Sequence, residues 1–383
     1  MHCTFQAAEP AISSFYEVLR AELPDTRDSR GKRLDLYFII VGVVLAMLTG
    51  SRTASSIVRY IGNSLGWLRR LTNEPDARPV SRSHLPVLLA GVDRAALNEL
   101  IFRHFGARLG PDEWAAVDGK ELRGCGSGEN RHAVLLAVGH DSKEEIAQMP
   151  QTGPKDSETV RVRSLLAESG LARNKVTLDA LHCNPETTSQ VARAGGTYLV
   201  QVKDNQPDLW AICALAAVQE PALARMVETE KAHGRLTTRE YELRVLRPHA
   251  LHKRWGPSKV RTLVSVVRRS EPINGQTAPS VELSCYISNA TIGDDRAKTL
   301  KELSGAIRHH WQVEANNWTR DVTLGEDGAK TVDGEQALAM AALRSLSLML
   351  LRKTRRKNLA EAIDRLRQVP GALVRLLRQS KFL

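Results

Sequence analysis

Apolar residues recur at helical spacing through most of the first hundred residues. The pattern predicts helices over residues 12–23, 36–48, 55–70 and 93–105, separated by turns rich in proline, glycine and polar residues. The second of these is apolar throughout, but it is shorter than the roughly 20 residues that cross a bilayer. We therefore expect a buried helix there, no membrane partner, and an N-terminal helical domain over residues 1–110.

From residue 111 the pattern changes to strands that alternate with helices. Short β-forming runs occupy residues 114–118, 132–139, 144–149, 175–180 and 197–203, and helical patterns precede the last two. Three hairpin strands followed by strand–helix–strand units are typical of a mixed sheet covered by helices. We expect residues 111–220 to form the first part of such an α/β domain.

The rest of the chain divides into a strand-rich part and a helical part. Residues 221–290 show alternating patterns, clearest over 237–245 and 261–268, and predict a β-rich insertion. Residues 291–383 are helical and carry the basic run Arg352-Lys-Thr-Arg-Arg-Lys357. We expect them to supply the helical remainder of the α/β domain and a basic tail.

Composition and charge narrow the class of protein. The hydrophobic share of 42% and the charged share of 25% are those of a globular chain. Lysine and arginine number 54 against 43 acidic residues, and the net charge of +11 favours a nucleic-acid partner, which the basic N-terminal helices could bind. The five cysteines form no Cys-x-x-Cys pair, which argues against a zinc knuckle and fits a reducing cytoplasm.

Two aspartates, Asp118 and Asp179, each follow a short run of β-forming residues. An aspartate at the end of a strand often caps a turn, and that interpretation stays open for either residue alone. Two at equivalent positions favour a shared site for hard divalent cations, which prefer carboxylate oxygens and support phosphodiester cleavage. Such a site requires a third carboxylate, and a helix packed against the sheet could supply it.

The segment from Ile307 to Asp321 is predicted to be an amphipathic helix that offers this third carboxylate. In it His310 and Glu314 are four residues apart and should face the same side. The alternative is that His310 and Trp311 pack into a core while Glu314 makes an ordinary surface ion pair.

Five ordered motifs resemble one family of enzymes. They are Val117-Asp-Gly-Lys120, Thr177-Leu-Asp-Ala-Leu-His182, Tyr198-Leu-Val-Gln-Val-Lys-Asp-Asn-Gln206, Arg308-His-His-Trp-Gln-Val-Glu314 and Arg320-Asp-Val-Thr-Leu-Gly-Glu-Asp327. Their order and spacing are similar to those of the DDE transposases of ISAs-type insertion sequences, which include the H-repeat-associated proteins. The basic segment Asp28-Ser-Arg-Gly-Lys-Arg33 and the segment Leu48-Thr-Gly-Ser-Arg52 resemble the helical domain associated with that family.

The resemblance implies a DNA transposase with an RNase H-like fold. Asp118, Asp179 and Glu314 would hold two Mg²⁺ or Mn²⁺ ions, cut the ends of the element and join them to target DNA, with a homodimer on the DNA. Around the site, the resemblance implies DNA-binding or supporting roles for a further set of residues: Lys120, His182, Lys203, Asn205, Gln206, Arg308 and His310.

One departure from the family pattern follows Glu314. The next residues are Ala315-Asn-Asn-Trp318, and Asp321 comes about one residue early. A one-residue deletion turns the following positions by about 100° if the helix continues, so either the helix ends near Asn316 or the acidic cluster is displaced. Glu326 and Asp327 are rival third ligands. A relative that binds DNA without cutting it, and an RNase H-like nuclease that does not transpose, remain alternative functions.

Overall fold

A computed structural model describes residues 14–28, 31–125, 132–152, 157–232, 234–273, 278–331 and 333–383. The chain forms two compact units. The helical unit consists of residues 1–106, 122–127 and 319–383, and the sheet unit consists of residues 107–121 and 128–318. The protein is a mixed α/β chain, as the sequence predicted.

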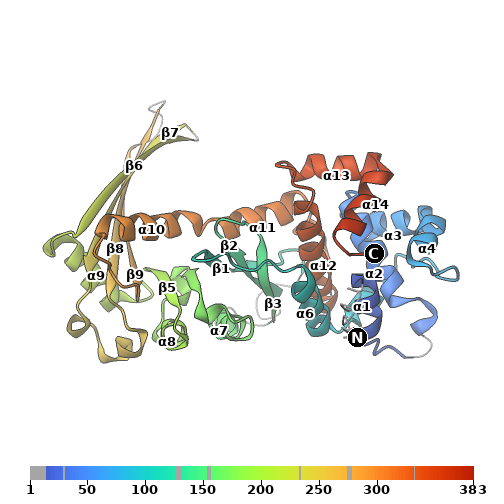
Figure 1. The fold of residues 1–383 in the computed structure, drawn as a ribbon, viewed down its shortest axis with the longest axis horizontal. Coiled ribbons are helices and arrows are strands. Elements are labelled where there is room, and N and C mark those ends of the chain that lie inside the picture. The colour runs from blue at the N-terminus through green and yellow to red at the C-terminus, as the bar shows by residue number, and fades with distance from the viewer. Residues whose placement is uncertain are drawn as a thin grey trace, which may run out of the picture. The chain divides into compact units, whose positions relative to one another are not determined.

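The sheet unit contains one nine-stranded sheet with the strand order β3-β2-β1-β4-β5-β9-β8-β7-β6 (Figure 1). The pairs β1–β4 and β4–β5 are parallel, and the other neighbours are antiparallel. The strands are β1 Trp114–Glu121, β2 His132–Gly139, β3 Glu145–Thr152, β4 Lys175–Leu178, β5 Thr197–Val202, β6 Ala224–Ala232, β7 Arg235–Val245, β8 Thr262–Pro272 and β9 Ser280–Ser288. The predicted β-rich insertion thus extends the same sheet beyond β5.

Helices cover both faces of this sheet because its strands alternate apolar residues between two cores. On one face, α7 (Ser157–Glu168), α8 (Pro185–Ala194) and α9 (Pro207–Gln219) bury residues such as Val162, Val191 and Leu209 against β1, β4 and β5. On the other face, α10 (Arg296–His309) buries Leu300 and Leu303 against β5, β7 and β8. Figure 1 shows α10 running across these strands.

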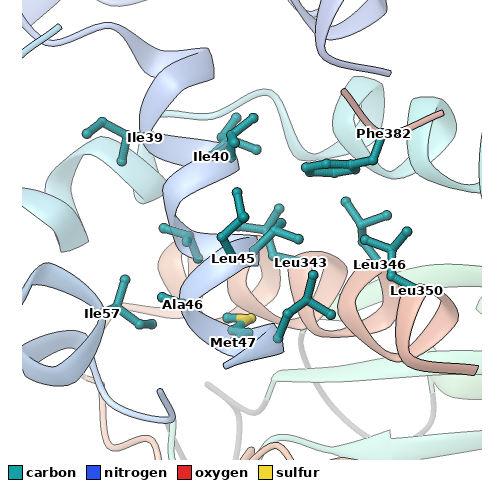
Figure 2. Packing of buried hydrophobic residues seen from close by; sticks show 14 of the residues in the cluster. Ile39, Ile40, Leu45, Ala46, Met47, Ile57, Leu343, Leu346, Leu350 and Phe382 are labelled. Carbon is teal, nitrogen blue, oxygen red and sulfur yellow. The ribbon is translucent and has the colours of Figure 1, made fainter. Parts of the chain in front are cut away.

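The helical unit is built around the uniformly apolar helix α2, Leu36–Leu48. Side chains on every side of α2 are buried, and the packing of Ile40, Leu45 and Met47 with Leu343 and Leu346 is visible in Figure 2. The described helices of this unit are α1 Phe15–Glu22, α2, α3 Ala54–Asn63, α4 Leu65–Thr72, α5 His84–Ala90, α6 Arg94–Phe105, α12 Gly334–Arg352, α13 Leu359–Gln368 and α14 Pro370–Gln379. The buried helix expected in place of a membrane span is therefore present. Across the described residues, every helix falls short of the length and apolarity that a bilayer crossing requires.

Two predicted helices are interrupted in the structure. The pattern over residues 55–70 divides into α3 and α4 at Ser64. The helix predicted from Ile307 to Asp321 breaks at His310 and Trp311, and α11 (Gln312–Val322) follows. Both halves keep apolar residues at helical spacing, so periodicity alone could not locate either break.

Candidate active site

The register of β1 and β4 brings Asp118 and Asp179 together. These strands are parallel, and Val117 of β1 lies opposite Leu178 of β4. The next residue on each strand is one of the two aspartates, so both follow the last paired position at the same edge of the parallel pair. The expectation that Asp118 ends its strand was wrong, because β1 continues to Glu121 through its antiparallel pairing with β2.

A cavity of about 350 Å³ contains all three predicted carboxylates, those of Asp118, Asp179 and Glu314. Glu314 lies in the first turn of α11, on its exposed side. The opposite side of this turn is fixed, because Val313 is fully buried and the buried Asn316 donates a 2.7 Å hydrogen bond to Glu145 at the start of β3. The helix thus presents Glu314 to the cavity and continues to Val322, so it does not end near Asn316.

Asp118 lies close to three other acidic residues, Asp179, Glu158 and Glu314. Burial, together with the charges of Asp179, Glu158 and Glu314, raises the pKa of Asp118 to about 7. A carboxyl that resists ionisation for these reasons is stabilised as a carboxylate by any cation that enters. In the part of the chain that the structure describes, no three His, Cys, Asp or Glu side chains form a ready-made metal centre.

Glu158 is a fourth acidic residue close to Asp118, and it was not predicted from the sequence. It lies in the first turn of α7 and is buried. A side-chain carbon at Gly119 would come within 2.5 Å of Glu158 Oε1, so the glycine next to Asp118 makes room for this carboxylate. A glutamate in the first turn of the helix after the third strand was the available signal.

His182 lies between Asp179 and Glu158. Its Nε2 is 3.6 Å from Asp179 Oδ1 and 3.8 Å from Glu158 Oε1, and its ring is fully buried. Burial lowers the pKa of His182. Neither ring nitrogen has a hydrogen-bond partner among the described residues. The structure therefore places His182 beside Asp179 and Glu158.

The other residues implied by the resemblance are placed differently. Lys203 lines the cavity, whereas Lys120 is buried and is not among the lining residues. Asn205 donates a 2.6 Å hydrogen bond to the carbonyl of Ala180, and so holds the turn that follows Asp179. Gln206 accepts a 2.8 Å hydrogen bond from Arg254. Asn205 and Gln206 thus make contacts within the protein.

A buried hydrogen-bonded group centred on Thr177 lies beneath the cavity. Thr177 Oγ1 is 2.9 Å from His310 Nδ1 and 3.0 Å from His140 Nε2. Burial lowers the pKa of His310 to about 4 and that of His140 to about 3, so both rings are neutral near pH 7. One hydroxyl can donate to one neutral ring and accept from the other. His310 thereby connects α10 to β4 next to Asp179.

Replacing Thr177 with valine should destabilise the sheet unit by about 1–3 kcal/mol, because two buried imidazole nitrogens lose their partner. Denaturant unfolding of the full chain measures this loss. Thr177→Ser is the matched control and should keep most of the stability, because it retains the hydroxyl. Equal stability of the valine variant and the unmodified chain would show that the hydroxyl bonds contribute nothing.

Cations from three distant parts of the chain surround the carboxylates. Arg239 of β7, Arg268 of β8 and Arg308 of α10 line the same cavity as Lys203. Arg239 and Arg308 both contact Glu230, at 3.1 and 3.0 Å. A DNA-binding or supporting role was predicted from the sequence for Arg308, but not for Arg239 or Arg268. The two missed arginines lie on strands that reach the site only through the pairing of the insertion with β5.

Glu326 and Asp327, the rival third ligands, lie in the helical unit. Glu326 is buried and accepts hydrogen bonds from Arg320 at 2.8 and 2.9 Å. Asp327 lies 4.0 Å from Arg123. A carboxylate already committed to a buried guanidinium is a poor candidate for a metal ligand. Glu314 is the acidic residue of this region that shares a cavity with both aspartates.

Comparisons with known proteins identify relatives of this chain. A sequence-family model described as DDE_Tnp_1-associated matches residues 18–105, which span α1 to α6 of the helical unit. The protein "Putative transposase YncI" of Escherichia coli O157:H7 is 24% identical over 344 residues, covering 86% of this chain and 85% of the relative. "H repeat-associated putative transposase YhhI" of Escherichia coli K12 is 23% identical over 360 residues, covering 90% and 93%.

Over most of its length, the chain is therefore similar to proteins named as putative transposases, and its N-terminal part matches the DDE_Tnp_1-associated model. A Xanthobacter autotrophicus relative, "Uncharacterized protein in dhlA 3'region", is 26% identical over 292 residues, which is 74% of this chain and 95% of the relative. The matches to the two Escherichia coli relatives extend over both units, whereas the family model covers helices of the helical unit alone. The similarity to these relatives therefore involves residues of both units.

Proposed function

We propose that this protein is a DDE transposase that cuts DNA at the ends of an insertion sequence and joins those ends to target DNA. The observation that carries the proposal is that Asp118 of β1, Asp179 directly after β4 and Glu314 of α11 line one cavity. Carboxylates placed together in this way have few structural uses, because burial and their mutual repulsion raise the pKa of Asp118. Such a destabilising arrangement is typical of a functional site.

The donor set of this cavity fits Mg²⁺ or Mn²⁺. Asp118, Asp179 and Glu314 offer oxygen ligands only, which hard divalent cations prefer. Two such ions, when bound, would activate the attacking oxygen and stabilise the leaving oxygen of the phosphodiester. Glu158 adds negative charge beside Asp118, and His182 lies between Glu158 and Asp179. We assign these two residues the positioning of the aspartates.

The sheet supports assignment to the RNase H-like class. Three antiparallel strands are followed by two parallel ones in the order β3-β2-β1-β4-β5, with a carboxylate on β1 and another directly after β4. The third carboxylate comes from a helix that follows the inserted strands β6–β9. This arrangement supports the proposal that the sheet unit is RNase H-like.

Cations at the rim of the cavity fit a DNA substrate. Lys203, Arg239, Arg268 and Arg308 can contact backbone phosphates next to the carboxylates, and binding would then weaken steeply with salt. The indole of Trp311 lines the same cavity and is 62% exposed, so an unpaired base could stack on it. Because an insertion sequence has two ends, we propose that a homodimer acts on the DNA.

An assay of cutting and joining tests this proposal. The full chain would be incubated with Mg²⁺, a DNA fragment that carries the ends of the element next to its gene, and a target plasmid. We expect cleaved ends and joined products with Mg²⁺, and neither in the presence of EDTA. Cleavage without joined products would identify a nuclease, and DNA binding without cleavage would identify a regulator; either result overturns the transposase assignment.

A further inference from the structure

A second cavity, of about 370 Å³, lies within the helical unit. Its walls come from four segments that are separate in sequence: residues 52–55, 82–89, 122–125 and 326–344. Four cationic side chains line it, those of Arg52, Arg82, Lys330 and Arg344, against one carboxylate, that of Glu326. The cavity therefore carries a strong positive charge.

The buried Arg344 lines this cavity and has unused donors. Arg344 is 3% exposed, and Glu326 lies 3.7 Å from its Nη1. Glu326 gives both oxygens to Arg320, which also donates to Ser345 at 2.7 Å. As a result, Nε and Nη2 of Arg344 have no hydrogen-bond partner within the described residues. A buried guanidinium with two unsatisfied donors is costly unless a ligand supplies oxygen atoms.

Backbone groups at the cavity add to the preference for an anion. The N-terminal end of α3 contributes Thr53, Ala54 and Ser55 to the wall, and the first backbone N–H groups of a helix favour negative charge. The loop that carries Lys330 is held in place, because the N–H of Thr331 donates to the carbonyl of Gly124 at 3.1 Å. A side chain at Gly124 would meet the carbonyl of Ala329 at 2.6 Å, so this close approach needs glycine.

We propose that this cavity binds a phosphate group. A phosphate has several oxygens with which to meet the fork of Arg344, the rim cations and the N–H groups of α3 together. The cavity brings together Arg52, from a motif of the helical domain, and Glu326, from the acidic segment that the carboxylate site does not use. It lies within one unit and shares no residue with the carboxylate cavity, so this inference does not depend on the proposed chemistry.

Binding of inorganic phosphate to the full chain tests the inference by calorimetry and thermal unfolding at constant ionic strength. We expect phosphate, but not chloride, to bind and to raise the unfolding temperature. Arg82→Gln should weaken phosphate binding about tenfold, the loss of one charged contact. Arg375→Gln, which removes an exposed arginine of the same unit outside the cavity, should bind as tightly as the unmodified chain. Absence of binding, or equal binding by both variants, overturns the proposal.

A second measurement identifies the source of the phosphate. If the group belongs to a DNA backbone, duplex DNA should compete with phosphate, and Arg82→Gln should reduce the dependence of DNA affinity on salt by about one ion. If the group belongs to a small phosphorylated molecule, both variants should bind DNA equally while only Arg82→Gln loses phosphate affinity. Either pattern supports the cavity as a phosphate site, and neither requires active carboxylates.

Discussion

Asp179→Asn should abolish Mg²⁺-dependent DNA cleavage while DNA binding is retained. Asparagine keeps the shape of the side chain and can still accept the hydrogen bond from the N–H of Leu181, now 3.0 Å from Asp179 Oδ1. It removes the negative charge that a divalent cation requires. We expect the rate of cleavage to fall by about 10³-fold or more, the scale that follows removal of a catalytic group. The measurement is nicking of a plasmid that carries the element's ends.

We expect cleavage to be lost without unfolding of the protein. In the folded chain the charge of Asp179 repels that of Asp118 and raises its pKa. Removing this charge should leave the chain at least as stable as before, and denaturant unfolding checks this. Asp208→Asn, an exposed aspartate in the first turn of α9, is the matched control and should cleave normally. Retained Mg²⁺-dependent nicking by Asp179→Asn would contradict the assignment of the carboxylates.

The strand patterns in the sequence predicted that Asp118 and Asp179 lie close together. This follows from the regular spacing of residues along two parallel strands. Once Val117 and Leu178 end a parallel pairing, the residues after them must be neighbours. The continuation of β1 past Asp118 depends instead on its pairing with β2 across a turn. A pattern of apolar residues carries no information about which neighbour extends a strand, so the strand end was placed too early.

Two cations of the site, Arg239 and Arg268, were not predicted from the sequence. The alternating patterns of their strands predict that both are ordinary exposed residues. They line the cavity only because β9 pairs with β5 and brings β8 and β7 after it. Strand order is a property of long-range pairing, which a single sequence does not encode in any local pattern. Arg308 was identified because it lies in a motif near Glu314.

Packing of the C-terminal helices was also beyond local patterns. The sequence placed residues 291–383 with the α/β domain, whereas the segment from residue 319 clusters with the N-terminal helices. Leu343 and Leu346 of α12 are buried in the same core as Ile40 and Leu45 of α2 (Figure 2). Both helices are apolar on most sides, and such helices pack in many ways. With this packing, Glu326 belongs to the helical unit, whereas Glu314 belongs to the sheet unit.

Glu326→Gln should destabilise the helical unit by about 3–5 kcal/mol, because it leaves two buried guanidinium groups without their carboxylate. Arg320 is fully buried and Arg344 is 3% exposed, and Glu326 lies between them. Arg320→Met should cost less, since Glu326 can then turn to Arg344. Denaturant unfolding of the full chain, followed by a probe in the helical unit, measures both changes.

The matched control is Glu335→Gln, which breaks a surface ion pair with Arg94 in the same unit and should cost under about 1 kcal/mol. Equal stability of the Glu326→Gln and Glu335→Gln proteins would show that the buried charges are balanced by other groups. The Glu326→Gln variant also tests the second cavity. Loss of Glu326 removes the only carboxylate among the described residues that line that cavity. Phosphate should therefore bind the Glu326→Gln protein more tightly and restore part of its stability, whereas a structural ion pair without a phosphate site predicts no such rescue.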